Sequence, residues 1–490
     1  MDSTRREPDG RAWMRRAAGP LAAALIFAGG LAGWHRVSRE ASIGEAMCHA
    51  LLDNSTAGRQ ALVSSAWWPP LPTLARLLLA AAMPDIEGWP VPSLLLGAAC
   101  GVGVVMLLLR TLARLGAGRI RYAFAAALAA HPAFVDACLD GSNTALLMLL
   151  AVLAAGGLAG WLARGGLRHL VGFAAGAGLI AGSSIALWPW IALAFALIAL
   201  DQAFDPASRA HKEAVLILAA LPALSMAALW CLMNWLIMGD PFYFLRSIPL
   251  RAPASAAAAL GAITRPHLAA AAAAAAALAV GLVRRDKPAA AAGLVGALPL
   301  AVAILLADRG LLWSPSAELA LLAPLAILAL AVLPGGRGRG RGSAVAAAAA
   351  AGLALFAWFA PGAADARAPA SDGFAGTIGE RNTWRPRIES HVRRQSRHAV
   401  VFVCGYDGFG LVGPRGRSPF VHALDFDFQA AERDYHGCAL FLLVPEPSGR
   451  SGAESLYWKF PGLYELGTRN TLFNGDWGRW RLYEVVQAPR

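Results

Sequence analysis

Residues 91–121 read VPSLLLGAACGVGVVMLLLRTLARLGAGRIR, an apolar run of membrane-spanning length that ends in a cluster of arginines. The same unit recurs from Pro20 to Ala360, and Arg and Lys cluster at every second break between the apolar runs. Because Lys and Arg near the ends of spans are retained on the cytoplasmic side, each cluster predicts an inside loop, and the breaks between clusters should face outward. The clusters are Arg5 to Arg16, Arg110 to Arg121, Arg164 to Arg168, Arg209 to Lys212, Arg284 to Lys287 and Arg337 to Arg341.

The composition agrees with a membrane protein. Of the 490 residues, 57% are hydrophobic and 15% are charged, and the mean hydropathy is +0.51. A water-soluble domain of this size is rarely so apolar. The formal net charge of +12 comes mainly from the loop clusters, so retention at the cytoplasmic face explains it better than nucleic-acid binding. No basic stripe interleaved with aromatic residues supports a nucleic-acid partner.

We expect about eleven transmembrane helices, since about 20 apolar residues suffice for one. The amino terminus resembles a secretory signal, but we interpret it as an uncleaved signal-anchor that follows a cytoplasmic segment, residues 1–16. The expected spans are 17–35, 91–109, 121–138, 143–163, 169–186, 187–203, 214–237, 267–283, 288–307, 319–334 and 343–360.

Two features of this topology are less regular than the rest. The fifth and sixth spans share Leu170 to Leu200, where only Ser183, Ser184 and Trp188-Pro189 mark a reversal. The arginine clusters on both sides favour the reversal, because one crossing cannot begin and end in the cytoplasm. A further apolar run, Leu71 to Met83, is interrupted by an arginine and too short to span, so it predicts an interfacial or re-entrant helix against the outer face.

After Ala360 the composition changes. Residues 361–375 are rich in Ala, Pro, Gly and Asp and are typical of a linker. Residues 376–490 hold a charged, helix-like segment and short apolar runs bounded by turn residues, which indicate strands. The helix-like segment is Thr383 to Arg397, and the expected strands are Ala399 to Cys404, Cys438 to Val444 and Trp480 to Val486.

The fold class predicted from these patterns is a multi-spanning α-helical membrane protein with a carboxy-terminal extracytoplasmic α/β domain. The transmembrane domain covers 17–360 and includes an outer loop at 36–90. Cys404 and Cys438 fall in the extracytoplasmic domain, where a disulfide can persist, and whether they pair is left open. The segment Cys404 to Gly408 follows a strand and either lines a site or forms a plain turn.

Acidic residues in the first outer loop are the first candidates for chemistry. A carboxylate beside a membrane cavity can act as a general base and take the proton of an attacking hydroxyl. Glu45, His49 and Asp53 are spaced by four, so a local helix would place them on one face, and Glu40 lies a little before them. The alternative is an interfacial amphipathic helix with a solvated acidic face.

A second candidate region begins at the outer end of the seventh span with Asn234 to Phe244, NWLIMGDPFYF. It opens a loop that contains Arg246, Arg251 and Arg265. Arginines in an outer loop are unusual, because Lys and Arg near the ends of spans are normally retained in the cytoplasm. Binding a lipid phosphate or pyrophosphate explains them, because a guanidinium pairs with phosphate oxygens in a fixed fork. General contact with lipid headgroups is the alternative.

A third candidate region is the tight outward turn expected between the third and fourth spans, from His131-Pro132 to Asn143. His131 and Asp136 lie within or near membrane depth, where ionisable groups tend to face a cavity or a partner, and Asp140 follows them in the turn. Helix capping by Asp140 or Ser142 is the ordinary alternative.

Taken together, these pieces resemble the GT-C superfamily, the multi-spanning glycosyltransferases that use polyprenyl-phosphate sugars. The nearest branch is that of the glycosyltransferase 39, ArnT-like and protein-mannosyltransferase-like proteins. Gly44-Glu45 lies where that group has an outer-loop acidic pair, and Trp68-Pro69-Pro70-Leu71 is similar to the segment that starts its juxtamembrane helix. The segment Asn234 to Phe244 and the strand Trp480 to Tyr483 also resemble its bacterial members.

The resemblance implies an inverting glycosyltransferase in the bacterial inner membrane, with its chemistry at the outer face. It would move a hexose or pentose from a polyprenyl-phosphate donor to a glycan, lipid or protein acceptor. The usual first acid of the pair is Gly44 here, so Glu45, Glu40 or Asp53 would serve as the base. The residues expected to bind substrate are Arg246, Arg251, Arg265, Asp136, Asp140, His131, Trp68 and Tyr243.

Several points stay open at this stage. No clear ligand set for a metal is present in the sequence, and the resemblance leaves a divalent cation, Mg²⁺ or Mn²⁺, undecided. A transporter or flippase of lipid-linked sugars is the main alternative function, although the apolar runs offer few polar residues along a path through the bilayer. A catalytically inactive scaffold for envelope assembly is the other alternative, because of Gly44. The sugar, the acceptor and the oligomeric state are not encoded in any pattern we recognise.

Overall fold

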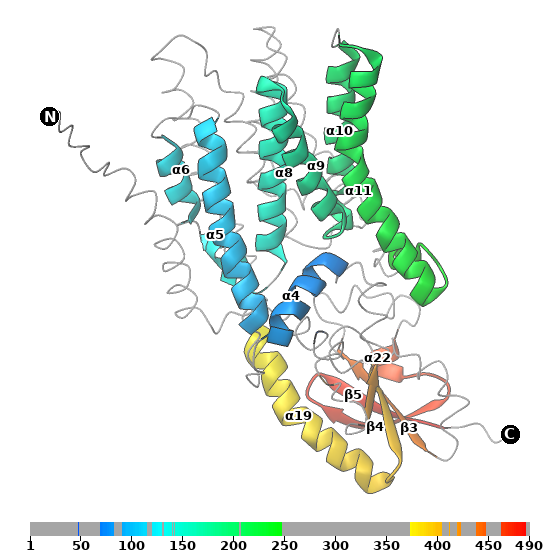
Figure 1. Cartoon of the computed structure of the whole chain (residues 1–490). Helices are drawn as coiled ribbons and strands as arrows, with labels where there is room; N and C mark the ends of the chain where they lie inside the picture. Colours follow the sequence, from blue (N-terminus) through cyan, green and yellow to red (C-terminus); the bar gives the residue numbers. More distant parts are fainter. Residues whose placement is uncertain are drawn as a thin grey trace, which may run out of the picture.

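The computed structural model describes a mostly helical region and, near the carboxyl terminus, a five-stranded sheet (Figure 1). In Figure 1 the sheet lies beyond one end of the helical bundle. The expected spans at 17–35, 267–283, 288–307, 319–334 and 343–360 lie outside the described part of the chain. The described residues are 48, 69–82, 91–114, 120–129, 132–139, 141, 143–204, 207–246, 373–403, 411, 419–422, 438–446 and 462–486.

The helical region follows the apolar runs of the sequence closely. The runs expected at 91–109, 143–163, 187–203 and 214–237 are all helical, and the short run Leu71 to Met83 is a 13-residue helix, α4. The elements are α4 (Pro70–Ala82), α5 (Val91–Arg114), α6 (Ile120–Ala129), α7 (Pro132–Leu139), α8 (Thr144–Arg164), α9 (Leu167–Ala181), η2 (Ile185–Leu187), α10 (Trp188–Phe204), α11 (Arg209–Met238) and α12 (Tyr243–Arg246).

Among the described residues, three helices are long and apolar enough to cross a membrane: α5, α8 and α11. Helices α4, α9 and α10 are also apolar but shorter. Helix α11 has 30 residues, so at 1.5 Å per residue it is about 45 Å long and exceeds the hydrocarbon core of about 30 Å. Its first turn, which holds Arg209 and Lys212, therefore extends beyond the apolar segment.

The helices alternate in direction, so the two ends of the bundle differ in sequence (Figure 1). One end, called here the basic end, holds the ends of α5, α8 and α10 and the starts of α6, α9 and α11, with Arg110, Arg121, Arg168, Arg209 and Lys212. The opposite end, called here the α4 end, holds α4, the start of α5, the α7–α8 turn, the α9–α10 reversal and the end of α11. The predicted reversal is confirmed, because α9 ends at Ala181 and α10 begins at Trp188.

The third expected span differs from the prediction. Instead of one helix over 121–138, the chain forms α6 and α7, which lead in series from the basic end to the α4 end. Pro132 is the first residue of α7. Its ring restricts the backbone of the preceding residue and it lacks the N–H that a continuous helix would need, so the helix breaks there. Asp136 consequently belongs to helix α7. The sequence predicted that it would lie in an outward turn, and that prediction was wrong.

Close backbone contacts join the central helices. Helix α9 packs between α8 and α11, and α8 also packs on α5. A Cβ atom on Gly157 of α8 would lie 2.3 Å from the backbone nitrogen of Phe173, and one on Gly178 of α9 would lie 2.9 Å from Cβ of Pro222 in α11. Such small residues let helix backbones approach in a bilayer, where dispersion contacts replace the hydrophobic effect.

The sheet has the strand order β2-β1-β3-β5-β4. Strand β1 (Ala399–Val403) pairs in parallel with β2 (Phe420–His422) and β3 (Ala439–Pro445). Strands β3, β5 (Trp480–Val485) and β4 (Thr471–Trp477) pair antiparallel in that order. Helix α19 (Gly373–Gln395) covers one face with Ile388 and Val392, and the short helix α22 (Leu463–Leu466) packs on the other through Leu463.

The three strands predicted from apolar runs are confirmed, and so is the helix-like segment before them, although α19 begins at Gly373, within the stretch predicted as a linker. Strand β1 is apolar at every position because both of its faces are covered. Strands β2 and β4 were not predicted. Cys438 is a free thiol at the amino end of β3. Val403, which directly precedes Cys404 in the sequence, lies at the carboxyl end of the parallel neighbour β1, which is the opposite edge of the sheet.

Candidate functional site

Most residues that the sequence predicted for a site lie outside the described part of the chain. Asp136 belongs to α7 and Arg246 to α12, and only their backbones are described. Tyr243 begins α12 and is half-buried. The residues outside the described part are Glu40, Glu45, Asp53, Trp68, His131, Asp140, Arg251 and Arg265, together with the segment Cys404 to Gly408.

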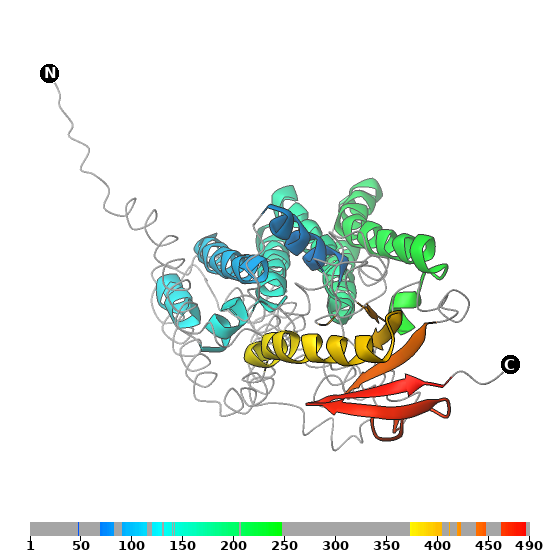
Figure 2. The same ribbon diagram turned by 90° about the horizontal axis from the view of Figure 1, so that it is seen from below.

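The described residues nevertheless show how α4 connects the elements next to the candidate regions. Helix α4 lies at an angle across one end of the bundle (Figures 1 and 2). At its amino end the backbone N–H of Leu71 donates to the carbonyl of Gly182 in the α9–α10 reversal, 3.2 Å away. One turn later, Nη2 of Arg76 donates to the carbonyl of Gly141 in the α7–α8 turn, 2.8 Å away. Helix α4 thus bridges two loops on the same end of the bundle.

The orientation of α4 is opposite to that of an amphipathic helix on a water-soluble protein. Its inward face holds Thr73 and Arg76, which are 2% and 1% exposed, while Leu74 and Leu78 on its outward face are 39% and 74% exposed. A helix that turns its leucines outward and its arginine inward fits a surface in contact with lipid and a polar interior. The sequence shows Arg76 only as the arginine that interrupts the apolar run Leu71 to Met83 and does not predict its inward orientation.

Thr73 also connects α4 to the first outer loop. Its hydroxyl donates to the carbonyl of Pro69, 2.9 Å away, which closes the first turn of the helix. Sγ of Cys48 lies 4.0 Å from the carbonyl oxygen of Thr73, and the Cys48 side chain is fully buried. Cys48 is three residues after Glu45 in the sequence. Cys48 is thus a described residue of the first outer loop that contacts α4.

An aromatic cluster joins the end of α11 to the α9–α10 reversal. The rings of Trp230 and Phe244 stack with centroids 4.9 Å apart, and the Trp188 ring meets both edge-on at 6.2 and 6.1 Å. Nε1 of Trp188 donates to the carbonyl of Ala181, 2.9 Å away. Such ring pairs stabilise by about 0.5–1.5 kcal/mol beyond the area that they bury. The cluster fixes α12 against the bundle.

The Gly-Asp-Pro segment after α11 has a local structural role. Gly239 caps the helix with φ +71°, a left-handed conformation that favours glycine. Oδ1 of Asp240 accepts a hydrogen bond from the N–H of Phe242, 2.9 Å away, which turns the chain into α12. Asn234 is fully buried one turn before the cap, and its Nδ2 donates to the carbonyl of Trp230. This turn sets the start of the loop that carries the predicted phosphate-binding arginines.

Buried polar side chains gather at the α4 end. Eleven polar or charged side chains are buried in the part of the chain that the structure describes, and eight of them lie there. The three at the basic end are Thr111, His169 and Gln202, and the eight at the α4 end are Thr73, Arg76, Ser93, Asn143, Thr144, Ser183, Ser184 and Asn234. Buried polar groups in a membrane-spanning bundle tend to mark functional sites.

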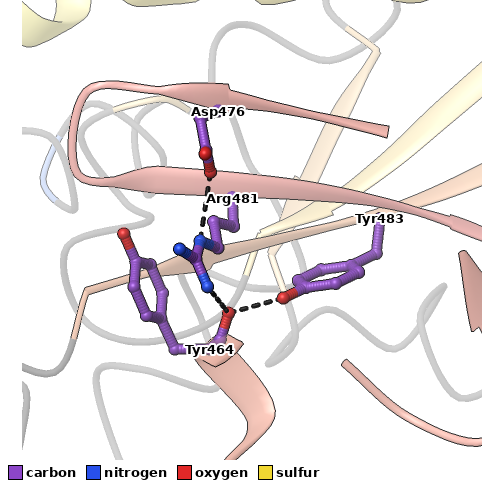
Figure 3. A network of polar contacts seen from close by, with 4 residues as sticks. All are labelled: Tyr464, Asp476, Arg481 and Tyr483. Atoms are coloured by element: carbon purple, nitrogen blue, oxygen red, sulfur yellow. Dashed lines mark hydrogen bonds and ion pairs between the residues drawn. The ribbon is translucent and has the colours of Figure 1, made fainter. Parts of the chain in front are cut away.

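A different polar network stabilises the carboxy-terminal sheet (Figure 3). Nε of Arg481 donates to Oδ1 of Asp476 at 3.1 Å, and its Nη1 donates to the carbonyl of Tyr464 at 3.2 Å. The hydroxyl of Tyr483 donates to the same carbonyl. Burial raises the pKa of the phenol groups of Tyr464 and Tyr483 above the ordinary value. The network connects α22 to β4 and β5, and we interpret its role as structural.

Within the described residues no group of three or more His, Cys, Asp or Glu side chains is arranged to hold a metal ion. No protein-family model matches the chain. A search of curated proteins finds no match either.

Proposed function

We propose that this protein is an integral-membrane glycosyltransferase of the GT-C type. It transfers a sugar from a polyprenyl-phosphate donor to a glycan, lipid or protein acceptor at the outer face of a bacterial inner membrane. In this proposal the α4 end of the bundle is the extracytoplasmic end, because the basic end carries the arginine clusters that are retained in the cytoplasm.

The concentration of buried polar side chains at the α4 end is the observation that supports the proposal. Eight of the eleven buried polar side chains of the described residues lie at that end. They come from α4, α5, α8, the α9–α10 reversal and α11, so elements far apart in the sequence contribute buried polar groups to the same end of the bundle. A reaction between a lipid-anchored donor and an acceptor outside the membrane needs polar groups at that depth and not at the bilayer centre.

The reaction uses a carboxylate and guanidinium groups. The acceptor hydroxyl oxygen attacks the anomeric carbon and its proton passes to the carboxylate, while the bond from the anomeric carbon to the phosphate oxygen breaks. The polyprenyl phosphate leaves with the electron pair, and Arg246 with Arg251 or Arg265 stabilises its charge. Glu45 is the preferred base, and covalent geometry keeps its Cα within about 11 Å of the Cα of Cys48, which is anchored on α4.

A transporter or flippase of lipid-linked sugars is the alternative that the same sequence allows. Such a protein needs polar groups along a path through the membrane. In the described helices no buried polar side chain lies between the two ends of the bundle. This distribution favours an enzyme with a site at one membrane face.

The test is sugar transfer by the full-length protein in nanodiscs with an undecaprenyl-phosphate-linked hexose or pentose. Release of undecaprenyl phosphate is measured with and without an extract of cell-envelope acceptors. Because general-base catalysis contributes 100-fold or more, Glu45→Gln is expected to lower the rate by at least about 100-fold while donor binding stays intact. Glu213→Gln, which changes an exposed acid near the basic end, serves as the matched control.

Other outcomes point elsewhere. Full activity of Glu45→Gln with loss in Glu40→Gln or Asp53→Asn would move the base but keep the reaction. Movement of the intact lipid-linked sugar across a liposome membrane without release of undecaprenyl phosphate would support the flippase. If the wild-type protein neither releases undecaprenyl phosphate nor moves the donor, the scaffold function gains support and the enzyme proposal fails.

A further inference from the structure

We propose that Arg76 is a positioning residue, which holds the α7–α8 turn against α4 and so fixes the buried polar side chains of these two elements relative to one another at the α4 end of the bundle. This inference rests on the glycosyltransferase function proposed above. Arg76 acts through the carbonyl of Gly141, 65 residues further along the chain, and not on the substrate.

The first step of the argument is the geometry of α4. Thr73 and Arg76 are three residues apart, so they share one face of the helix about 4.5 Å apart along its axis. The Thr73 carbonyl contacts Cys48, and the Arg76 guanidinium donates to the carbonyl of Gly141. Less than one helical turn of α4 therefore contacts both the first outer loop and the α7–α8 turn.

The second step concerns what these two elements carry. Thr73 lies on α4, Asn143 and Thr144 follow Gly141 within three residues, and all three side chains are buried. They belong to the buried polar side chains at the α4 end on which the proposed function rests. Because each lies within a few residues of the contact between Arg76 and Gly141, a shift of α4 relative to the α7–α8 turn changes their separation.

The third step is energetic. A guanidinium stays charged at any physiological pH, and taking it out of water to 1% exposure carries a large desolvation cost. Replacing a buried ionic group by an apolar side chain of similar size is often neutral or stabilising. Stability alone is thus a poor reason for an arginine at this position, whereas a rigid, multi-donor side chain is well suited to fix the position of a turn.

The experiment compares Arg76→Met with Arg76→Lys in full-length protein in nanodiscs. Methionine keeps the length and packing of the stem but removes the charge and the donors, and lysine keeps the charge without the planar fork. Hydrogen–deuterium exchange is followed in residues 70–82 and 139–146, with residues 170–178 of α9 as an internal reference. In Arg76→Met, exchange in the first two segments is expected to rise about tenfold or more together, with α9 unchanged.

Kinetics separate positioning from a merely structural contact. A displacement of about 1 Å between reacting groups can lower the rate about 100-fold. For Arg76→Met, kcat is therefore expected to fall about 10- to 100-fold, while KM for the lipid-linked donor changes less than about threefold. Arg76→Lys should recover part of kcat. Arg209→Met is the matched control, because that arginine is 92% exposed at the basic end, and it should alter neither readout.

The outcomes are distinguishable from those of the function itself. Unchanged exchange in residues 139–146 overturns the inference, and so does increased exchange with wild-type kcat and KM. If the wild-type protein transfers no sugar, the proposed function fails, but the exchange data still decide whether Arg76 couples the two segments. Should Arg76→Met fail to fold, the lysine variant carries the same two measurements.

Discussion

The helical bundle and the carboxy-terminal sheet satisfy their polar side chains in different ways. At the α4 end of the described bundle, buried side chains bond to backbone carbonyls: those of Cys48, Thr73, Arg76 and Asn234. At the basic end, the buried Gln202 instead donates to its neighbour Asp201. In the sheet region, side chains bond to one another. The pairs that do so include His391 with Asn474, Gln395 with Asn474, and Arg481 with Asp476.

The difference follows from the solvent that each region meets. In a bilayer no water can satisfy a polar group, so each one must find an acceptor on the protein, and carbonyls of nearby loops and helix turns are always available. Beside water, side chains can form a network at a lower free-energy cost, because a water molecule can replace any hydrogen bond that is lost. In the bundle, position therefore depends on packing and on backbone anchors, and in the sheet it depends more on side-chain networks.

The largest effect should come from the aromatic cluster of the bundle. Trp230 is 1% exposed and packs against Trp188 and Phe244. Because truncation leaves a cavity that helices cannot fill, Trp230→Ala should lower the free energy of unfolding by about 3–5 kcal/mol. Trp235→Ala on the same helix is the control, since that side chain is 59% exposed and its removal should cost under about 1 kcal/mol. Denaturant unfolding in bicelles measures both; equal losses would show that the cluster adds nothing.

The next effect tests backbone packing between helices. Gly157→Ala places a Cβ 2.3 Å from a backbone nitrogen in α9, so the helices must separate. Overpacking of this kind typically costs about 1–3 kcal/mol. Gly172→Ala lies on the facing helix, and its Cβ would meet nothing closer than 3.8 Å. Thermal unfolding in detergent should therefore separate the two variants, and similar midpoints would contradict close packing of α8 on α9.

The helices of the bundle are the part of the fold that the sequence predicts best, although it does not predict these packing contacts between them. Apolar runs bounded by arginines identify α5, α8 and α11, because length and charge are local properties of the chain. The α9–α10 reversal follows from the parity of the arginine clusters, although Ser183 and Ser184 are weak turn signals by themselves. The break between α6 and α7 was missed because the apolar run continues across Pro132.

Long-range and irregular features were not predictable in the same way. The partner of Arg76 is a carbonyl 65 residues away, and no local pattern encodes such a contact. Strand β4 contains Asn474-Gly475-Asp476, which has the composition of a turn. A β-bulge between Phe473 and Gly475 accommodates it within the strand. For the candidate site, the sequence identified loops and residue types, while the inward face of α4 and the gathering of buried polar side chains required three dimensions.

A smaller effect is expected for the side-chain network of the sheet. Asn474, at the bulge, accepts hydrogen bonds from the side chains of His391 and Gln395 at 2.7 and 3.2 Å. Asn474→Ala removes this tie between β4 and α19 and should cost about 1–2 kcal/mol, less than Trp230→Ala because water can replace the lost bonds. Leu472→Ala is the control on the same strand, with its side chain 62% exposed. Hydrogen exchange of α19 measures the loss of stability. Equal protection in both variants would show that the side-chain network does not stabilise the packing of α19 on the sheet.

The smallest effect is a pH dependence confined to the sheet. Burial raises the pKa of Tyr483 and Tyr464 in the folded protein above the ordinary value of about 10. Above pH of about 10 the unfolded chain releases these protons before the folded chain does. Stability that is full at lower pH is therefore lost as the pH rises through the folded pKa values.

Two variants test this pH dependence. Tyr483→Phe also removes the hydroxyl that donates to the Tyr464 carbonyl. It should cost about 1 kcal/mol at neutral pH, since Arg481 still bonds that carbonyl. Above pH 10 its stability should fall less steeply than that of the wild type. Tyr464→Phe keeps the aromatic ring under the Arg481 guanidinium. It should reduce the slope of stability against pH only by the contribution of the Tyr464 phenol. Exchange of residues 462–486 between neutral and alkaline pH measures these slopes, and identical slopes in all three proteins would mean that neither phenol titrates with unfolding.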